Sequence, residues 1–374
     1  MSRILFVTWD GGGNVGPAVL IAAELQRRGD SVRFLGQPQQ REALEGAGFA
    51  FTGYSTPHLW RATGRRGALK NAVGFLGLLV GRSLGRDLLA EVAERPVDLV
   101  VIDCLLFGAL DAAARAGLRY AVLVHSLYAA IDRTMAAGAP GAVARLAGLP
   151  PRELWAGGAP VVVTTLEGLD PGRDTPGIRL DYTGPVIAAL ESSRGSAAAQ
   201  AGQPSILVSL STTFIAGQSR VLQKILDAAA DLPVHVIVTT GPAVDPSELR
   251  APANAEVHAF LPHAEVMPRV SFVVGHGGHS TTMLALAHDL PLVILPMNLL
   301  FDQPIISEVV QKAGAGVTLK SGSSVADIRA AIEGMLAPGP YRSEAARLGA
   351  EIRATGGPVA AADLLQAGVL APAS

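Results

Sequence analysis

The chain has 374 residues, with 30 lysines and arginines against 32 aspartates and glutamates, which gives a formal net charge of −2. This length suits two domains of roughly 180 residues each, and the lack of a basic excess excludes a typical nucleic-acid-binding protein. The single cysteine, Cys104, excludes an intramolecular disulfide. Neither an export signal nor an apolar run of the about 20 residues that span a membrane is visible. We therefore expect a cytoplasmic protein without stable membrane association.

Short runs rich in Val, Ile and Leu alternate with alanine-rich helical segments, a pattern typical of parallel strands covered by helices on both faces. In the first half we predict strands at 3–8, 31–35, 98–102, 120–124 and 161–164, and helices at 16–28, 38–46, 107–117 and within 68–95. In the second half we predict strands at 205–210, 234–238, 256–258, 271–274, 292–295 and 316–318, and helices at 217–230, 279–288, 303–313 and 324–336. The fold class is α/β, with a doubly wound parallel sheet in each half.

The predicted domains follow from this alternation. Residues 1–188 form the first domain, and 189–204, rich in small and polar residues without apolar periodicity, form a linker. Residues 205–340 form the second domain. A last helical segment, within 341–374, is broken near Gly356-Gly357-Pro358. Ligands of such sheets bind at the carboxyl ends of the strands, so we expect functional residues in the loops after strands.

The loop that follows the strand at 271–274 is suited to a phosphate or diphosphate. His276, Gly277 and Gly278 make a flexible turn, and Ser280 and Thr281 open the next helix. Free backbone N–H groups, hydroxyl groups and the positive end of the helix would converge there. A plain glycine turn with Ser280 as the helix N-cap explains the same residues.

Two further loops after strands carry polar side chains. Asp302 and Gln303 begin a helix, and a carboxylate beside a carboxamide can hold vicinal sugar hydroxyls; a simple helix cap at Asp302 is the alternative. Ser211 and Thr212 follow the strand at 205–210 and offer two hydroxyl groups.

The segment "HAFLPHAEVMPRVSFVVGHGGHSTTMLALAHDLPLVILPMNLLFDQP" (258–304) resembles the C-terminal signature of the family 1 nucleotide-sugar-dependent glycosyltransferases, above all the bacterial enzymes that glycosylate macrolides and other natural products. The resemblance extends over nearly the whole chain. It implies the GT-B fold, in which two Rossmann-like domains face each other across a cleft and the C-terminal helix crosses back to the first domain. It also implies inverting transfer of a sugar, such as a deoxysugar, from a UDP- or dTDP-sugar to an apolar small-molecule acceptor.

The resemblance assigns roles to the loops of the second half. His276 and Thr281 would contact the diphosphate, with Gly277 and Gly278 allowing close approach and Ser280 beside them. The remaining donor-binding residues would be Asp302 and Gln303 at the sugar, Phe260 and Leu261 at the base, and Ser211 and Thr212 at the β-phosphate, where Ser211 replaces a usual glycine. No Asp-x-Asp cluster appears, so we expect neither a metal nor another cofactor besides the sugar-nucleotide co-substrate.

At the position of the catalytic base, this chain differs from the family. The family's first loop usually carries Gly-His-x-x-Pro, whose histidine deprotonates the acceptor, whereas this chain has Asn14 at that position. An amide is not a base at neutral pH. Asp103, at the end of a strand, matches the aspartate that orients the family's histidine, and a cap or buried carboxylate is its plain alternative. We predict Asp103 as the base and His125 as the second candidate.

The acceptor is expected to bind in the first half. Residues 54–86 and 126–155 interrupt the α/β alternation, and such insertions often form variable ligand pockets. The predicted acceptor-binding residues are Gly12 and Gly13 of the first loop and the aromatic residues Trp60, Phe75, Phe107 and Tyr128. Each aromatic residue alone is equally explained by packing in the core.

Other functions stay open at this point. The missing histidine also fits a non-catalytic nucleotide-sugar-binding partner of another transferase, or a C-glycosyltransferase, whose carbon nucleophile needs less help from a base. A sugar-nucleotide epimerase or a lipid-linked cell-wall transferase would need an acidic pocket or a basic apolar face, and neither is evident. A homodimer is compatible with the sequence.

Overall fold

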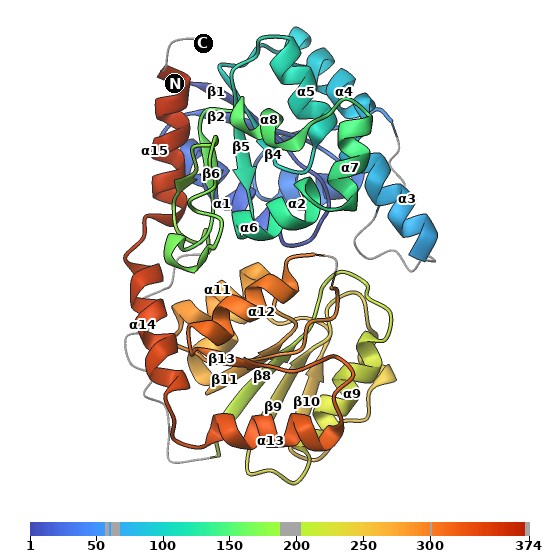
Figure 1. Ribbon diagram of the computed structural model, residues 1–374, viewed down its shortest axis with the longest axis vertical. Coiled ribbons are helices and arrows are strands. Elements are labelled where there is room, and N and C mark those ends of the chain that lie inside the picture. The colour runs from blue at the N-terminus through green and yellow to red at the C-terminus, as the bar shows by residue number, and fades with distance from the viewer. Residues whose placement is uncertain (57–59, 61–67, 188–202, 300, 371–374) are drawn as a thin grey trace. The chain divides into compact units, whose positions relative to one another are not determined.

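A computed structural model of the chain describes residues 1–56, 60, 68–187, 203–299 and 301–370. They form two compact units: Met1–Val186 together with Thr355–Ser374, and Ile187–Ala354. Each unit is a parallel sheet with helices on its faces (Figure 1). The predicted linker at 189–204 lies almost entirely outside the described residues.

The sheet of the first unit has, in the described part, the strand order β3-β2-β1-β4-β5-β6-β7, and every pairing is parallel. Its strands are β1 (Arg3–Val7), β2 (Ser31–Gly36), β3 (Ala50–Gly53), β4 (Leu99–Asp103), β5 (Tyr120–Val124), β6 (Val161–Val163) and β7 (Asp181–Tyr182). The five predicted strands are present. Strands β3 and β7, which are short and lie at the two edges of the sheet, are not among the predicted strands.

The helices of the first unit are α1 (Val15–Arg27), α2 (Arg41–Gly46), α3 (Ala68–Leu79), α4 (Arg82–Glu94), α5 (Phe107–Arg115), α6 (Tyr128–Ile131), α7 (Ala139–Leu146), α8 (Pro151–Ala156) and α15 (Gly357–Leu370). One core joins β1, α1 and α15 through Ile4, Phe6, Ile21 and Leu365, all at most 1% exposed. Helices α4 and α5 pack against each other on the other side of the sheet (Figure 1). The inner strands β1, β4, β5 and β6 are buried on both faces, as their continuous apolar runs predict.

The second unit repeats this plan, with the strand order β10-β9-β8-β11-β12-β13. Its strands are β8 (Ser205–Ser209), β9 (His235–Thr239), β10 (Ala255–His258), β11 (Phe272–Gly275), β12 (Leu292–Ile294) and β13 (Gly316–Thr318). Its helices are α9 (Gln218–Ala229), α10 (His263–Val266), α11 (His279–Ala287), α12 (Gln303–Lys312), α13 (Val325–Leu336) and α14 (Tyr341–Arg353). All six predicted strands of this half are present.

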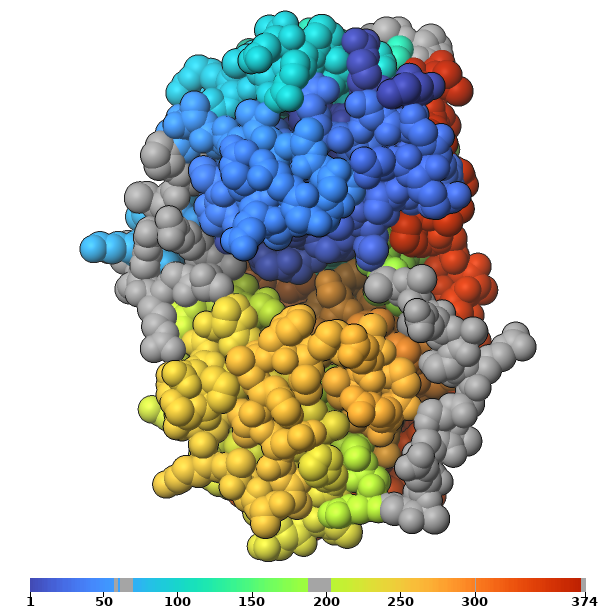
Figure 2. Space-filling model, turned by 180° about the vertical axis from the view of Figure 1, so that it is seen from behind, coloured from blue at the N-terminus to red at the C-terminus, as the bar shows by residue number. Residues whose placement is uncertain are grey.

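The C-terminal segment is divided between the units. Helix α14 belongs to the second unit, whereas α15 belongs to the first, so the part of 341–374 that returns begins only at Thr355. Gly357 adopts φ +49°, a left-handed conformation that favours glycine, and its N–H donates to the Thr183 carbonyl at 2.8 Å. Helix α15 lies beside α1, on the surface seen in Figure 2. An ion pair of 2.6 Å between Arg28 and Asp363 joins the two helices.

Both sheets reverse their strand order next to their first strand, between β1 and β4 and between β8 and β11. At such a switch point the two adjacent connections leave toward opposite faces, and the loops after the strands are free to bind ligands. Within the described residues, no helix has the length and apolar character required to cross a membrane.

Candidate active site

The loop after β1 is closed by the side chain of Asn14. Its Nδ2 donates to the Trp9 carbonyl and to Asp103 Oδ2, both at 3.0 Å, and its Oδ1 accepts the Gly11 N–H at 3.1 Å. Asn14 is only 2% exposed. All of its contacts hold other groups in place, so Asn14 is a positioning residue in this loop.

Asp103 and His125 form a buried pair at the switch point of the first sheet. Strands β4 and β5 are parallel neighbours, so the loops after them leave the same edge of the sheet. His125 Nδ1 lies 3.1 Å from Asp103 Oδ2, and Asp103 Oδ1 accepts the Leu105 N–H at 3.0 Å. Asp103 is 3% exposed, whereas the side chain of His125 is 14% exposed. Because Nδ1 faces the carboxylate, Nε2 is the nitrogen that remains for a substrate.

The pair shifts the pKa of both members. Burial raises the pKa of Asp103, but the charge and hydrogen bond of His125, with the N–H groups of Leu105 and Asn14, lower it below its usual value. Burial lowers the pKa of His125, but the charge and hydrogen bond of Asp103 raise it well above 6.5. An imidazole in this pair is therefore a stronger base than a free one.

Cys104 lies next to this pair, with its Sγ 4.0 Å from His125 Nδ1. Asp103, Cys104 and His125 are the one group of three potential metal ligands in the described part of the chain. Burial, followed by the charge of Asp103, raises the pKa of the thiol, which disfavours the thiolate that binds metals. The Asp103 oxygen that faces His125 also accepts from Asn14. The polar groups of this cluster thus already have hydrogen-bond partners within the protein.

Aromatic residues gather beside the first loop. Trp9, Trp60 and Phe75 form a cluster with ring centroids 5.1 to 6.3 Å apart. Gly12 adopts φ +84° and Gly13 is exposed, so the glycines turn the loop next to this cluster. Trp9 is not among the predicted residues, although its position two residues after the end of β1 could have marked it.

Two of the predicted acceptor-binding residues are core residues. Phe107 and Tyr128 are 0% exposed and pack around Trp155, with centroid distances of 6.2 and 5.8 Å. Phe107 begins α5 and Tyr128 begins α6, and both rings lie in the interior of the first unit. The prediction that they line an open pocket is not met in this structure.

In the second unit, the loop after β11 holds His276 in a neutral form. Burial lowers the pKa of His276 to about 4, although a hydrogen bond with the Ser209 backbone acts in the other direction. Its Nδ1 is buried and has no hydrogen-bond partner. A Cβ atom at Gly278 would lie 2.5 Å from the His276 ring, and Gly277 adopts φ +80°, so both glycines are needed for this conformation.

Helix α11 begins directly after these glycines. Gly278 occupies the N-cap position, so Ser280 is not the N-cap that the plain explanation required, and its side chain is exposed. Thr281 is partly buried. The N-terminal backbone N–H groups of this nine-residue helix and these hydroxyls lie at the carboxyl edge of the sheet, as the phosphate prediction requires.

Asp302 and Gln303 begin α12, but they differ in burial. Asp302 is the N-cap residue without a side-chain cap bond and is partly exposed. Gln303 is 6% exposed, and its Oε1 accepts the N–H groups of Met297 and Asn298 at 2.7 and 2.8 Å. Gln303 therefore holds the loop after β12, and only its amide N–H groups remain for a ligand.

The loops after β8 and β10 complete this edge. Ser211 is 6% exposed and its Oγ accepts the Thr213 N–H at 3.0 Å, whereas Thr212 is exposed. Phe260 is 76% exposed, and Leu261 beside it is partly buried. An exposed phenylalanine ring at a strand end is a platform on which a flat group can stack.

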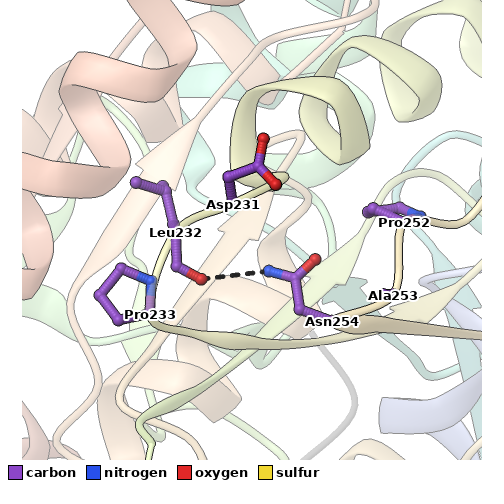
Figure 3. Close-up of a pocket in the computed structure, with 6 residues that line it drawn as sticks. All are labelled: Asp231, Leu232, Pro233, Pro252, Ala253 and Asn254. Carbon is purple, nitrogen blue, oxygen red and sulfur yellow. Dashed lines mark hydrogen bonds between the residues drawn. The ribbon is translucent and has the colours of Figure 1, made fainter.

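A pocket of about 240 Å³ in the second unit is remote from these loops (Figure 3). It is lined by Asp231, Leu232, Pro233, Pro252, Ala253 and Asn254. These residues precede β9 and β10, so the pocket lies at the amino ends of the strands. The candidate donor residues all follow strands, at the opposite edge, and we assign the ligand site to them.

Comparisons with known proteins agree with this geometry. Residues 223–367 match the family described as erythromycin biosynthesis protein CIII-like, C-terminal domain. The 4'-demethylrebeccamycin synthase of Lentzea aerocolonigenes is 27% identical over 98% of this chain and 99% of its own length.

Two solved structures are similar over the whole chain. The calicheamicin glycosyltransferase CalG4 has a TM-score of 0.80 and 24% identity, with 100% of both chains covered. The glycosyltransferase VinC, solved with dTDP, has a TM-score of 0.73 and 18% identity, with 99% of this chain and 100% of that chain covered. Residues 223–367 therefore carry the erythromycin biosynthesis protein CIII-like C-terminal domain, and the chain as a whole has the GT-B fold of these solved glycosyltransferases.

Proposed function

We propose that this enzyme is an inverting, metal-independent glycosyltransferase that moves a sugar, such as a deoxysugar, from a UDP- or dTDP-sugar to a hydroxyl group of an apolar aglycone, with His125 as the base. The observation that carries the proposal is the contact of 3.1 Å between His125 Nδ1 and Asp103 Oδ2. The usual histidine–aspartate pair is thus replaced by one in which the histidine comes from the loop after β5. Asn14 stands at the position where the resembled family usually has a histidine, and its Nδ2 donates a hydrogen bond to Asp103.

In the proposed reaction, His125 Nε2 takes the proton of the acceptor hydroxyl as its oxygen attacks the anomeric carbon. The bond between that carbon and the β-phosphate oxygen breaks, and its electron pair leaves with the nucleoside diphosphate. A single displacement of this kind inverts the anomeric configuration. Asp103 keeps the ring oriented and stabilises the imidazolium that forms, as the aspartate of a catalytic triad does.

The donor would be held by the loops of the second unit. The N-terminus of α11 and the hydroxyls of Ser280 and Thr281 would donate to the diphosphate, and the neutral ring of His276 would contact it. These groups would perform the charge stabilisation that a metal supplies in other transferases. Phe260 would stack on the base and Asp302 would hold sugar hydroxyls. The structure of VinC with dTDP supports a thymidine nucleotide as one donor type.

The test is incubation of the protein with UDP- and dTDP-sugars and a panel of aromatic and macrocyclic acceptors, with and without EDTA, followed by mass spectrometry of the products. We expect a glycoside with inverted configuration, formed equally with EDTA. Binding of nucleotide without product across the panel would support the non-catalytic partner instead. Loss of turnover in EDTA would overturn metal independence.

The loop after β11 gives a separate prediction for donor binding. Gly278→Ala should weaken dTDP or UDP binding by about 5- to 100-fold, because the new methyl group displaces the His276 ring and removes its contact with the ligand. Isothermal titration calorimetry measures the change. Gly334→Ala is the matched control, since a Cβ there meets nothing within 4 Å, and it should bind as the wild type does. Equal affinity of both variants would contradict the role of His276.

A further inference from the structure

The aromatic cluster of Trp9, Trp60 and Phe75 contains buried hydrogen-bond donors without acceptors. Trp9 Nε1 and Trp60 Nε1 are both buried and unpartnered, and Trp9 as a whole is 4% exposed. Gln40, 5% exposed, adds a third such donor through its Nε2. Most buried polar groups in proteins are satisfied, so unsatisfied donors in one region require an explanation.

The surroundings of these donors are fixed. Gln40 Oε1 accepts the Gln37 N–H at 2.8 Å, and Gln37 Oε1 accepts the Asp10 N–H at 2.7 Å. Gln37 Nε2 in turn donates to the Trp60 carbonyl at 3.2 Å. Because the carbonyl ends of both glutamines are held by backbone N–H groups, the amide of Gln40 cannot turn an oxygen toward the indoles without losing a bond.

The cluster is linked directly to the catalytic pair. The Trp9 carbonyl accepts the Asn14 Nδ2, which also donates to Asp103 Oδ2, each at 3.0 Å. A Cβ at Gly11 would lie 2.6 Å from the Trp9 ring, so the indole packs directly on the glycine-rich loop. A ligand against Trp9 would therefore lie beside the loop that positions Asp103.

We infer that Trp9 and Trp60 bind the acceptor through its oxygen atoms, and that the acceptor class is a planar ring system with ring carbonyl groups. The three rings form one apolar cluster, and the unpartnered N–H groups of its two indoles can only donate, so they select a ligand that presents acceptor oxygens. This inference rests on the proposed function, because it names the acceptor of that reaction.

The test compares two probes that share a frame and differ in carbonyl groups, 2-hydroxyanthraquinone and 2-hydroxyanthracene. Isothermal titration calorimetry is performed without any donor on the His125→Gln variant, so that binding is measured without turnover. We expect the quinone to bind about tenfold more tightly, as one to two added hydrogen bonds imply. In Trp9→Phe and Trp60→Phe the ratio of the affinities for the quinone and for 2-hydroxyanthracene should fall toward one, while the affinity for 2-hydroxyanthracene itself should not change.

Three results would overturn the inference: equal affinity for the two probes, no binding of either, or a preference that persists in both tryptophan variants, as expected if water satisfies the N–H groups. The comparison of probes on a protein with all its tryptophans needs no variant of the cluster to fold. Trp155→Phe is the control, because its indole N–H already donates to the Cys104 carbonyl at 2.8 Å, and its loss should leave the preference unchanged. Preference for the quinone without glycoside formation by the wild type would reject the proposed function and keep this inference.

Discussion

His125→Gln is expected to lower kcat for sugar transfer by about 10²- to 10⁴-fold, the range that a general base contributes. Glutamine can still donate a hydrogen bond to Asp103, 3.1 Å from the present His125 Nδ1, but it cannot accept the proton of the acceptor hydroxyl. Binding of dTDP should be unchanged, because the donor loops belong to the other unit. Steady-state kinetics with saturating donor and calorimetry of dTDP binding measure the two quantities.

His235→Gln is the matched control for this substitution. His235 lies at the start of β9, has a side chain that is 42% exposed and contacts Glu256 at the surface, so its replacement should leave kcat unchanged. An acceptor with a strongly acidic phenol should lose less activity in His125→Gln than an alcohol does, because it needs less help to lose its proton. Full activity of His125→Gln with an alcohol acceptor would reject His125 as the base.

Much of the fold could be predicted from the sequence because its signals are local. The strands at the centres of both sheets are continuous runs of Val, Ile and Leu, as in Val100 to Ile102, and they end at glycines or polar residues. The order of motifs in the second half predicted which loops carry polar groups, and these loops do lie at one edge of the sheet. Short edge strands such as Ala50–Gly53 have neither length nor periodicity to mark them.

The candidate site was harder to predict, because the chemistry depends on pairing across strands. Asp103 is the first candidate base because it ends a strand and matches the aspartate of the resembled family, and nothing in the sequence shows that His125 lies 3.1 Å from it. Tertiary packing also buries Tyr128, and it places the Gln303 side-chain carbonyl where it accepts two backbone N–H groups. Spacing along the chain carries none of this information.

The Asp103–His125 pair should also determine how activity and folding stability depend on pH. The pKa of His125 lies well above its ordinary 6.5, and only the neutral ring can accept a proton, so kcat/KM should rise with pH through a higher pKa than that of an ordinary histidine and then level off. The contribution of His125 to folding stability changes with pH in the opposite direction. A group whose pKa is higher in the folded chain stabilises the fold fully below its unfolded pKa, and this contribution is lost as pH rises through the folded pKa.

Asp103→Asn separates the two candidate bases. Asp103 Oδ1 accepts the Leu105 N–H and Oδ2 accepts from Asn14 Nδ2, so the introduced NH₂ group opposes one of these donors in either orientation. Where it replaces Oδ2, it also faces His125 Nδ1. Nδ1 would then accept and Nε2 would carry the proton, which is the wrong tautomer for a base. We expect kcat to fall by about 10⁴-fold, as for the corresponding change in a catalytic triad. The remaining activity should show its rise with pH at a lower pH than in the wild type, because the carboxylate that raises the pKa of His125 is gone.

The double variant His125→Gln with Asp103→Asn gives the decisive comparison. If the residues act as a unit, the double variant should be about as slow as the slower single variant, because groups of one catalytic unit are not additive. If Asp103 alone were the base, Asp103→Asn would abolish turnover and His125→Gln would retain most of it. Removing one partner of a buried pair costs about 3 to 5 kcal/mol of stability, so urea unfolding must show each variant folded at the assay temperature. A pH profile that does not move in Asp103→Asn would separate the carboxylate from the titration of His125.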